Sequence, residues 1–140
     1  MNKIILIIED KPEQILIAKK AAADCGLSPL VASNLTDAIR LLEKMKNLLF
    51  AVATDLHYPI RCGDDISRSE QPNGLAIVAL CIQNNIRVAV CSDINHHQSD
   101  YVKILVKVLE TNQNCFGNRI PFIEDKKDWN YVIKELLTIK

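Results

Sequence analysis

Acidic and hydroxyl side chains follow three of the most apolar segments of this 140-residue sequence. They are Glu9 and Asp10 after the run IILII, Asp55 after LLFAVAT, and Ser92 with Asp93 after VAVC. Two adjacent acids at the end of a buried strand must either repel each other or share something positive. Clusters that offer only oxygen ligands suit a hard cation such as Mg²⁺, which takes a few carboxylates and keeps several waters.

Five apolar runs predict the strands that would position these side chains. They lie at residues 4–8, 30–32, 48–53, 88–91 and 120–123. The first, third and fourth are apolar on successive residues, which is typical of strands buried on both faces. Pro121 favours an edge position for the fifth strand, because proline cannot donate a hydrogen bond within a sheet.

Helical patterns fill the intervals between these runs. The first starts near Pro12 and is expected to end at Gly26, and the second is expected to be capped by Ser33 or Asn34. Strand and helix alternate five times, which predicts an α/β fold with a parallel sheet covered on both faces. Ligands of such sheets bind beyond the carboxyl ends of the strands, so the acids converge if the first, third and fourth strands are neighbours.

Composition limits the classes of protein to consider. With 49% hydrophobic residues, residues 1–140 are expected to form a single domain. Seventeen basic and 17 acidic residues give no net field that would attract nucleic acid or an anionic membrane, and no apolar run could span a bilayer. The five scattered cysteines predict reduced thiols in a cytoplasmic protein.

One segment, residues 57–74, interrupts the alternation. It is polar, contains two prolines and two glycines, and is long for a connection in so small a domain. Such loops are usually either functional or mobile. Asp64 and Asp65 lie within it, and we expect solubility to explain them better than metal binding.

Several of these stretches resemble the receiver domain of two-component response regulators. ILIIEDKPEQ resembles the first strand, acidic pair and first helix of that family, DLHYP its phosphoacceptor aspartate with a proline four residues later, NGLAIV the start of its third helix, and IRVAVCSD its fourth strand with a terminal hydroxyl. The resemblance covers nearly the whole chain. It implies a flavodoxin-like, doubly wound sheet of five parallel strands in the order 2-1-3-4-5, with helices on both faces.

The resemblance also implies a role for each site residue. Asp55 would accept a phosphoryl group, and Ser92 would hydrogen-bond that group. Mg²⁺ would be held by Glu9, Asp10, Asp55 and the backbone carbonyl of His57. The metal would neutralise charge at a carboxylate that is otherwise a poor phosphoryl acceptor.

The sequence departs from the receiver pattern in two places. Receivers carry a lysine, usually followed by proline, at the end of the fifth strand, whereas this chain has IEDKKDW. Lys126 or Lys127 is the nearest cation, and we take Lys126 as the candidate. The second departure is the long segment 57–74, which could cover the site.

Other interpretations of the same residues remain open. Asp10 could be the N-cap of a capping box with Glu13, which would explain one acid without a metal. Ser92 could simply cap a turn.

Three functions follow from these residues. The resemblance implies a stand-alone signalling domain that is phosphorylated by a histidine kinase or phosphotransfer protein. It would act through a downstream protein partner, or a homodimer, at its fourth-helix and fifth-strand face. The alternative is a pseudo-receiver, an interaction module that is not productively phosphorylated. A phosphohydrolase is disfavoured, because His57 stands where a second aspartate would serve as acid or base.

Overall fold

The computed structural model describes residues 2–63, 71–92, 100–111, 120–123 and 126–138. Strands and helices alternate along the chain. The strands are β1 (Lys3–Ile8), β2 (Leu27–Ala32), β3 (Leu49–Thr54), β4 (Arg87–Cys91) and β5 (Phe122–Ile123). The helices are α1 (Pro12–Asp24), α2 (Leu35–Met45), α3 (Gly74–Gln83), α4 (Asp100–Thr111) and α5 (Trp129–Thr138).

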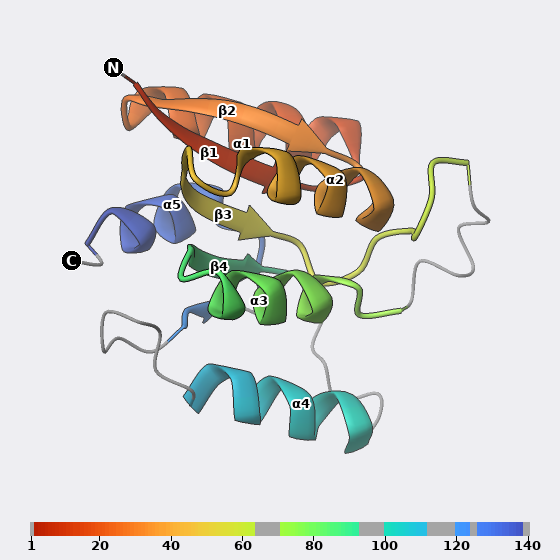
Figure 1. The fold of residues 1–140 in the computed structure, drawn as a ribbon. Coiled ribbons are helices and arrows are strands. Elements are labelled where there is room, and N and C mark those ends of the chain that lie inside the picture. The colour runs from red at the N-terminus through yellow and green to blue at the C-terminus, as the bar shows by residue number, and fades with distance from the viewer. Residues whose placement is uncertain (1, 64–70, 93–99, 112–119, 124–125, 139–140) are drawn as a thin grey trace.

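The five strands form one parallel sheet in the order β2-β1-β3-β4-β5 (Figure 1). This confirms the predicted α/β, flavodoxin-like fold and strand order. Because every pairing is parallel, the carboxyl ends of all strands lie at one edge of the sheet. We call this the carboxyl edge and the opposite one the amino edge.

The sheet separates two apolar layers. Side chains of alternate strand residues pack with α2, α3 and α4 on one face, and the others pack with α1 and α5 on the opposite face (Figure 1). The central strands are buried on both faces, as their unbroken apolar runs predict. Among the described helices, none is long and apolar enough to cross a membrane.

Several helices and strands begin or end at the residues that the sequence predicts. Gly26 follows α1 with a φ of +76°, a conformation that glycine adopts without strain. Asn34, rather than Ser33, caps α2, and its side chain accepts a hydrogen bond from the backbone N–H of Asp37 at 2.9 Å. β5 lies at the edge of the sheet and begins one residue after Pro121, as expected for an edge strand next to a proline.

Candidate functional site

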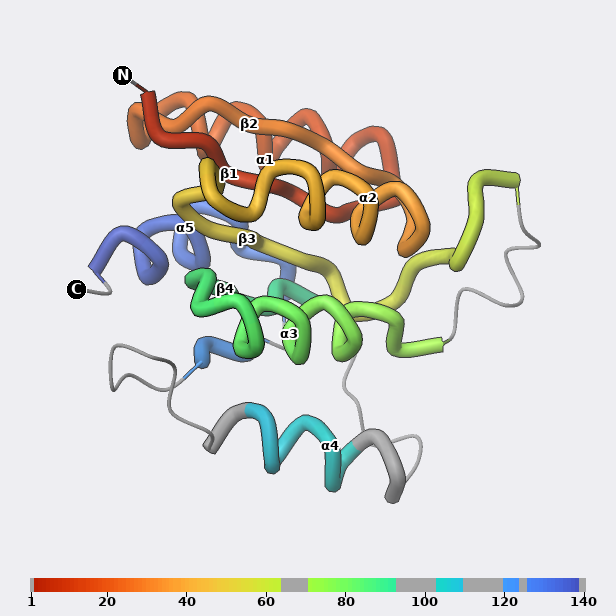
Figure 2. The backbone as a smooth tube through the Cα atoms, in the orientation of Figure 1, coloured from red at the N-terminus to blue at the C-terminus, as the bar shows by residue number. Residues whose placement is uncertain are grey.

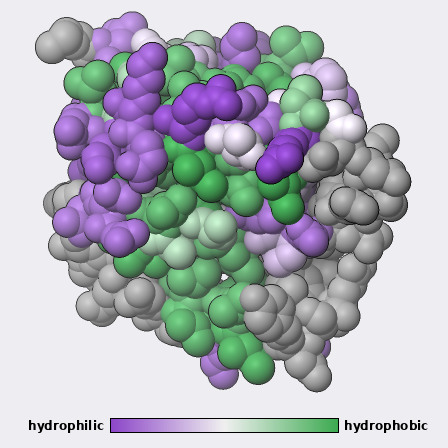
Figure 3. Space-filling view, turned by 45° about the vertical axis from the view of Figure 1, so that its right-hand side comes forward, coloured by the Kyte–Doolittle hydropathy of each residue, from purple (hydrophilic) through white to green (hydrophobic). Residues whose placement is uncertain are grey.

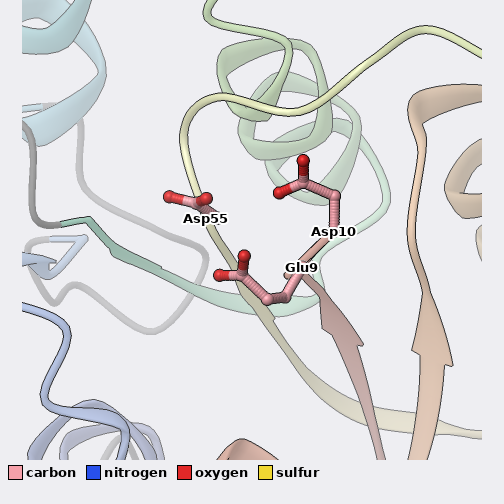
Figure 4. Close-up of side chains that lie close together, drawn as sticks. All are labelled: Glu9, Asp10 and Asp55. Carbon is pink, nitrogen blue, oxygen red and sulfur yellow. The ribbon is translucent and has the colours of Figure 1, made fainter. Parts of the chain in front are cut away.

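The ends of β1 and β3 bring three carboxylates together. Ile8 pairs with Thr54 in the sheet, and the backbone N–H of Asp55 donates to the Ile8 carbonyl at 2.9 Å, so Asp55 lies beside the acidic pair. One carboxylate oxygen from each of Glu9, Asp10 and Asp55 lies within 4.8 Å of the others. Figure 4 shows the three groups around a common space beyond the two strands.

Two of these carboxylates are buried. Glu9 is 0% exposed and Asp55 is 4% exposed. Backbone groups hold both of them, because the N–H of Leu56 donates to Oδ1 of Asp55 at 2.7 Å and that of Lys11 donates to Oε1 of Glu9 at 3.1 Å. Each side chain therefore keeps its second oxygen directed at another partner.

That partner is Lys127, which corrects our choice of Lys126. The Nζ atom of Lys127 lies 2.7 Å from Oε2 of Glu9 and 3.0 Å from Oδ2 of Asp55, and its side chain is 5% exposed. Lys126 is exposed. Lys127 is the fourth residue after Ile123, the last residue of β5, so it comes later in the sequence than the end of the strand.

One lysine does not neutralise this group of acids. Burial is the main cause that raises the pKa of Glu9 to about 7, the nearby charge of Asp55 adds to it, and Lys127 opposes it. Burial also raises the pKa of Asp55 despite the same lysine. For Lys127, burial alone lowers the pKa, but Asp55 and Glu9 together raise it to about 12. The ammonium group therefore stays charged, but its single positive charge does not bring the pKa values of Glu9 and Asp55 back to their ordinary range.

The donor set fits a divalent metal ion. All three acidic side chains offer oxygen, the ligand type that Mg²⁺ prefers. When ionised, three carboxylates and one ammonium carry a net charge of two negatives, which one Mg²⁺ would balance. Asp10 is partly buried, whereas the other two acids are buried.

The capping-box explanation of Asp10 is wrong. Lys11 occupies the N-cap position of α1, and no side chain caps this helix. The backbone N–H groups of Gln14 and Ile15 both donate to the Lys11 carbonyl, at 3.0 Å each. Asp10 therefore does not cap α1, and its negative charge instead helps to raise the pKa of Asp55.

The structure also describes two further candidate residues, Ser92 and His57. Ser92 follows β4, the neighbour of β3, and is fully buried; its backbone N–H donates to the Ile123 carbonyl at 2.8 Å. His57 lies two residues after Asp55 and is half-buried. Asp64, Asp65 and Asp93 lie outside the described residues.

The start of the long segment 57–74 is hydrogen-bonded to the first turn of α2. The backbone N–H groups of Leu35 and Thr36 donate to the carbonyls of Pro59 and Ile60, both at 2.9 Å, and the Thr36 hydroxyl also donates to Ile60 at 2.8 Å. Figure 2 shows this segment leaving the carboxyl edge beside the first turn of α2. The expectation that the segment covers the site also involves residues 64–70, which lie outside the described residues.

No protein-family model matches the sequence, and no curated protein matches it significantly. Solved structures do resemble its fold. A response regulator receiver domain protein from Clostridium thermocellum is 18% identical with a TM-score of 0.63, and the match covers 96% of this chain and 94% of that one. This chain therefore has the fold of response regulator receiver domains. The chemotaxis response regulator CheY4 of Vibrio cholerae is 12% identical with a TM-score of 0.66 over 100% of both chains.

A putative response regulator from Chloroflexus aurantiacus gives the same result. It is 13% identical, with a TM-score of 0.65 over 99% of this chain and 98% of that one. At such low identities, similarity extends to the arrangement of strands and helices. The chemistry of the candidate site therefore depends on the side chains of this chain.

An apolar groove of about 580 Å³ lies between α3 and α4. Its apolar lining includes Leu75, Ala76, Ala79, Leu105, Val108 and Leu109. Figure 3 shows apolar surface gathered over these helices. On α4, Ile104 and Val108 are 62% and 56% exposed, so this helix presents large apolar side chains to the solvent.

Proposed function

We propose that this chain is a receiver-like signalling module of the cytoplasm that accepts a phosphoryl group on Asp55 in the presence of Mg²⁺. The observation that carries the proposal is the contact of Lys127 with both Glu9 and Asp55, beside Asp10. A receiver site needs several acids, a lysine and a hydroxyl at the carboxyl edge. In this proposal they come from the residues that follow β1, β3, β4 and β5.

The proposed reaction transfers a phosphoryl group to a carboxylate oxygen of Asp55. A bond forms between that oxygen and phosphorus while the bond from phosphorus to the donor's leaving atom breaks, which gives an acyl phosphate. Positive charge at the transferred oxygens stabilises the transition state of such a reaction. Lys127 supplies part of this charge, and a bound Mg²⁺ would supply the rest.

The proposed donor is a histidine kinase or a phosphotransfer protein. The phosphorylated form would then act on a downstream protein partner, or on a second copy of the chain, through α4 and the neighbouring β5. The exposed Ile104 and Val108 on α4 support this choice of surface, because exposed apolar patches commonly mark protein interfaces. Phosphorylation would bias this surface only as far as it stabilises one of its conformations.

The alternative proposal is a pseudo-receiver that binds a partner without productive phosphorylation. The length of the segment 57–74 favours it, since this segment begins next to Asp55. The position of Lys127 weakens it, because the cation that the sequence pattern lacked is supplied from the loop after β5.

Intact mass spectrometry with acetyl phosphate tests the proposed function. We expect wild-type protein with Mg²⁺ to gain one phosphoryl group and the Asp55→Asn variant to gain none. Lack of an adduct on the wild type, together with no change in Trp129 fluorescence on adding beryllofluoride, would contradict phosphorylation. If Mg²⁺ still bound, that result would support the pseudo-receiver.

A further inference from the structure

The backbone turn that follows β3 is held by the start of α3. The carbonyl of Leu56 accepts a hydrogen bond from the N–H of Gly74 at 2.9 Å, and the carbonyl of Tyr58 accepts one from Nδ2 of Asn73 at 2.6 Å. These two carbonyls flank His57 in sequence. The start of α3 therefore forms a hydrogen bond to the turn on each side of His57.

Asn73 makes this contact in place of an ordinary helix cap. It occupies the N-cap position of α3, yet its side chain makes no capping bond. Asparagine normally caps a helix with its side-chain oxygen, as Asn34 does for α2. The amide of Asn73 is instead directed at a residue 15 positions earlier in the chain.

Gly74 permits the close approach that this contact needs. A Cβ atom at position 74 would lie 2.3 Å from the carbonyl oxygen of Asp55 and 2.9 Å from Cα of Leu56. Both of these are backbone atoms, which cannot give way as a flexible side chain would. Only glycine therefore allows α3 to begin against the turn that carries the acceptor residue.

The strand side holds the same turn through two buried hydroxyl groups. The Thr54 hydroxyl donates to the Asp55 carbonyl at 2.7 Å, and Oγ1 of Thr54 lies 3.1 Å from the phenol oxygen of Tyr58. Since the single hydroxyl hydrogen of Thr54 is used, the phenol is the donor to Thr54. Tyr58 is fully buried, which raises the pKa of its phenol and keeps that hydrogen in place.

We propose that Asn73 is a positioning residue that fixes the turn Leu56–Tyr58, and with it the His57 carbonyl, for the metal ion. Tyr58 supports the same turn from the strand side. This inference rests on the proposed function, in which that carbonyl is one of the Mg²⁺ ligands. It also gives a reason why a long segment is tolerated here, since Tyr58 and Asn73, close to its two ends, are joined by a hydrogen bond.

A matched pair of substitutions tests this role. Asn73→Ala removes the amide that donates to Tyr58, whereas Asn84→Ala removes an amide that donates to the Leu80 carbonyl at 2.8 Å, at the other end of the same helix. Mg²⁺ affinity is measured by titration calorimetry, and stability by urea unfolding. Groups that orient metal ligands typically change metal affinity by roughly 10–100-fold when removed.

We expect Asn73→Ala to weaken Mg²⁺ binding about tenfold, and Asn84→Ala to leave it within about twofold of wild type. Equal Mg²⁺ affinities of the two variants would overturn the positioning role, even if both lose stability. If Asn73→Ala does not fold, Tyr58→Phe removes only the phenol hydrogen bond and should still weaken binding several-fold. An unchanged affinity would then overturn the proposal. A wild-type protein that binds no Mg²⁺ would overturn the metal site itself.

Discussion

Charged side chains lie at both edges of the central part of the sheet, and the two edges bury them to very different degrees. At the carboxyl edge, β1 and β3 lead into Glu9 and Asp55, which are buried around Lys127. At the amino edge, the first residues of β1 and β4 are Lys3 and Arg87. Their cationic groups lie 4.5 Å and 4.6 Å from the centre of the Phe50 ring on β3.

The two edges differ in the burial of their charged groups more than in the charges themselves. Lys3 is exposed, so water already solvates its charge and the contact with Phe50 adds little. Lys127 is 5% exposed and contacts two carboxylates that water barely reaches. Removing a charge should therefore cost far more at the carboxyl edge than at the amino edge.

The largest effect is expected for Lys127→Met. This change leaves Glu9 and Asp55 buried without their cation, and breaking a buried ion pair typically costs about 3–5 kcal/mol. We expect a loss of that order in the free energy of unfolding at pH 8, measured with urea in the absence of metal. The loss should be smaller at pH 5, where the carboxylates can take up protons.

Lys126→Met is the matched control, because Lys126 is exposed. Its free energy of unfolding should stay within about 0.5 kcal/mol of wild type, as is usual for surface substitutions. Equal losses in the two variants would show that Lys127 contributes no more than an ordinary surface lysine.

The pH dependence of stability should come next in size. The pKa of Glu9 rises from 4.5 to about 7 on folding, so the folded protein holds this proton more tightly than the unfolded chain. The corresponding stabilisation is complete below pH 4.5 and is lost as the pH rises to 7. At 1.36 kcal/mol per pH unit, this amounts to about 3 kcal/mol.

Glu9→Gln isolates this effect, because glutamine cannot titrate. In the absence of metal, the stability of the wild type relative to Glu9→Gln should fall between pH 5 and pH 8, as followed by urea unfolding. A difference that stays constant across this range would show that Glu9 titrates normally, which would contradict its burial in the folded protein.

The smallest effect is expected at the amino edge, for Lys3→Met. An exposed cation–π contact contributes about 0.5–1 kcal/mol, so the free energy of unfolding should fall by no more than that. Mg²⁺ affinity should not change, because Lys3 begins β1 and the acids follow its other end. A loss as large as that of Lys127→Met would remove the contrast between the two edges.

The sequence was sufficient to predict the fold because each central strand is buried on both faces. Such strands appear as continuous apolar runs, and the alternation of five runs with five helical patterns allows few arrangements. Even the edge position of β5 was predicted, from Pro121. The bounds of β5 were predicted less well, since only Phe122 and Ile123 pair with β4.

The grouping of Glu9, Asp10 and Asp55 was predicted in the same way, because each lies within two residues of a strand end. Lys127 was not, since it lies in an irregular connection after a two-residue strand, beside a second lysine of the same type. No local pattern distinguishes Lys126 from Lys127. The roles of Asn73 and Gly74 were equally hidden, because they depend on how closely α3 approaches β3.

Locating the phosphoryl group on the protein tests the central claim most directly. Wild-type protein treated with acetyl phosphate and Mg²⁺ is reduced with borohydride, which converts an aspartyl phosphate to homoserine, and its peptides are sequenced by mass spectrometry. Homoserine at position 55, and at no other position, is the predicted result. A modification at Asp10 instead, or unmodified aspartate at position 55 in protein that binds Mg²⁺, would contradict it.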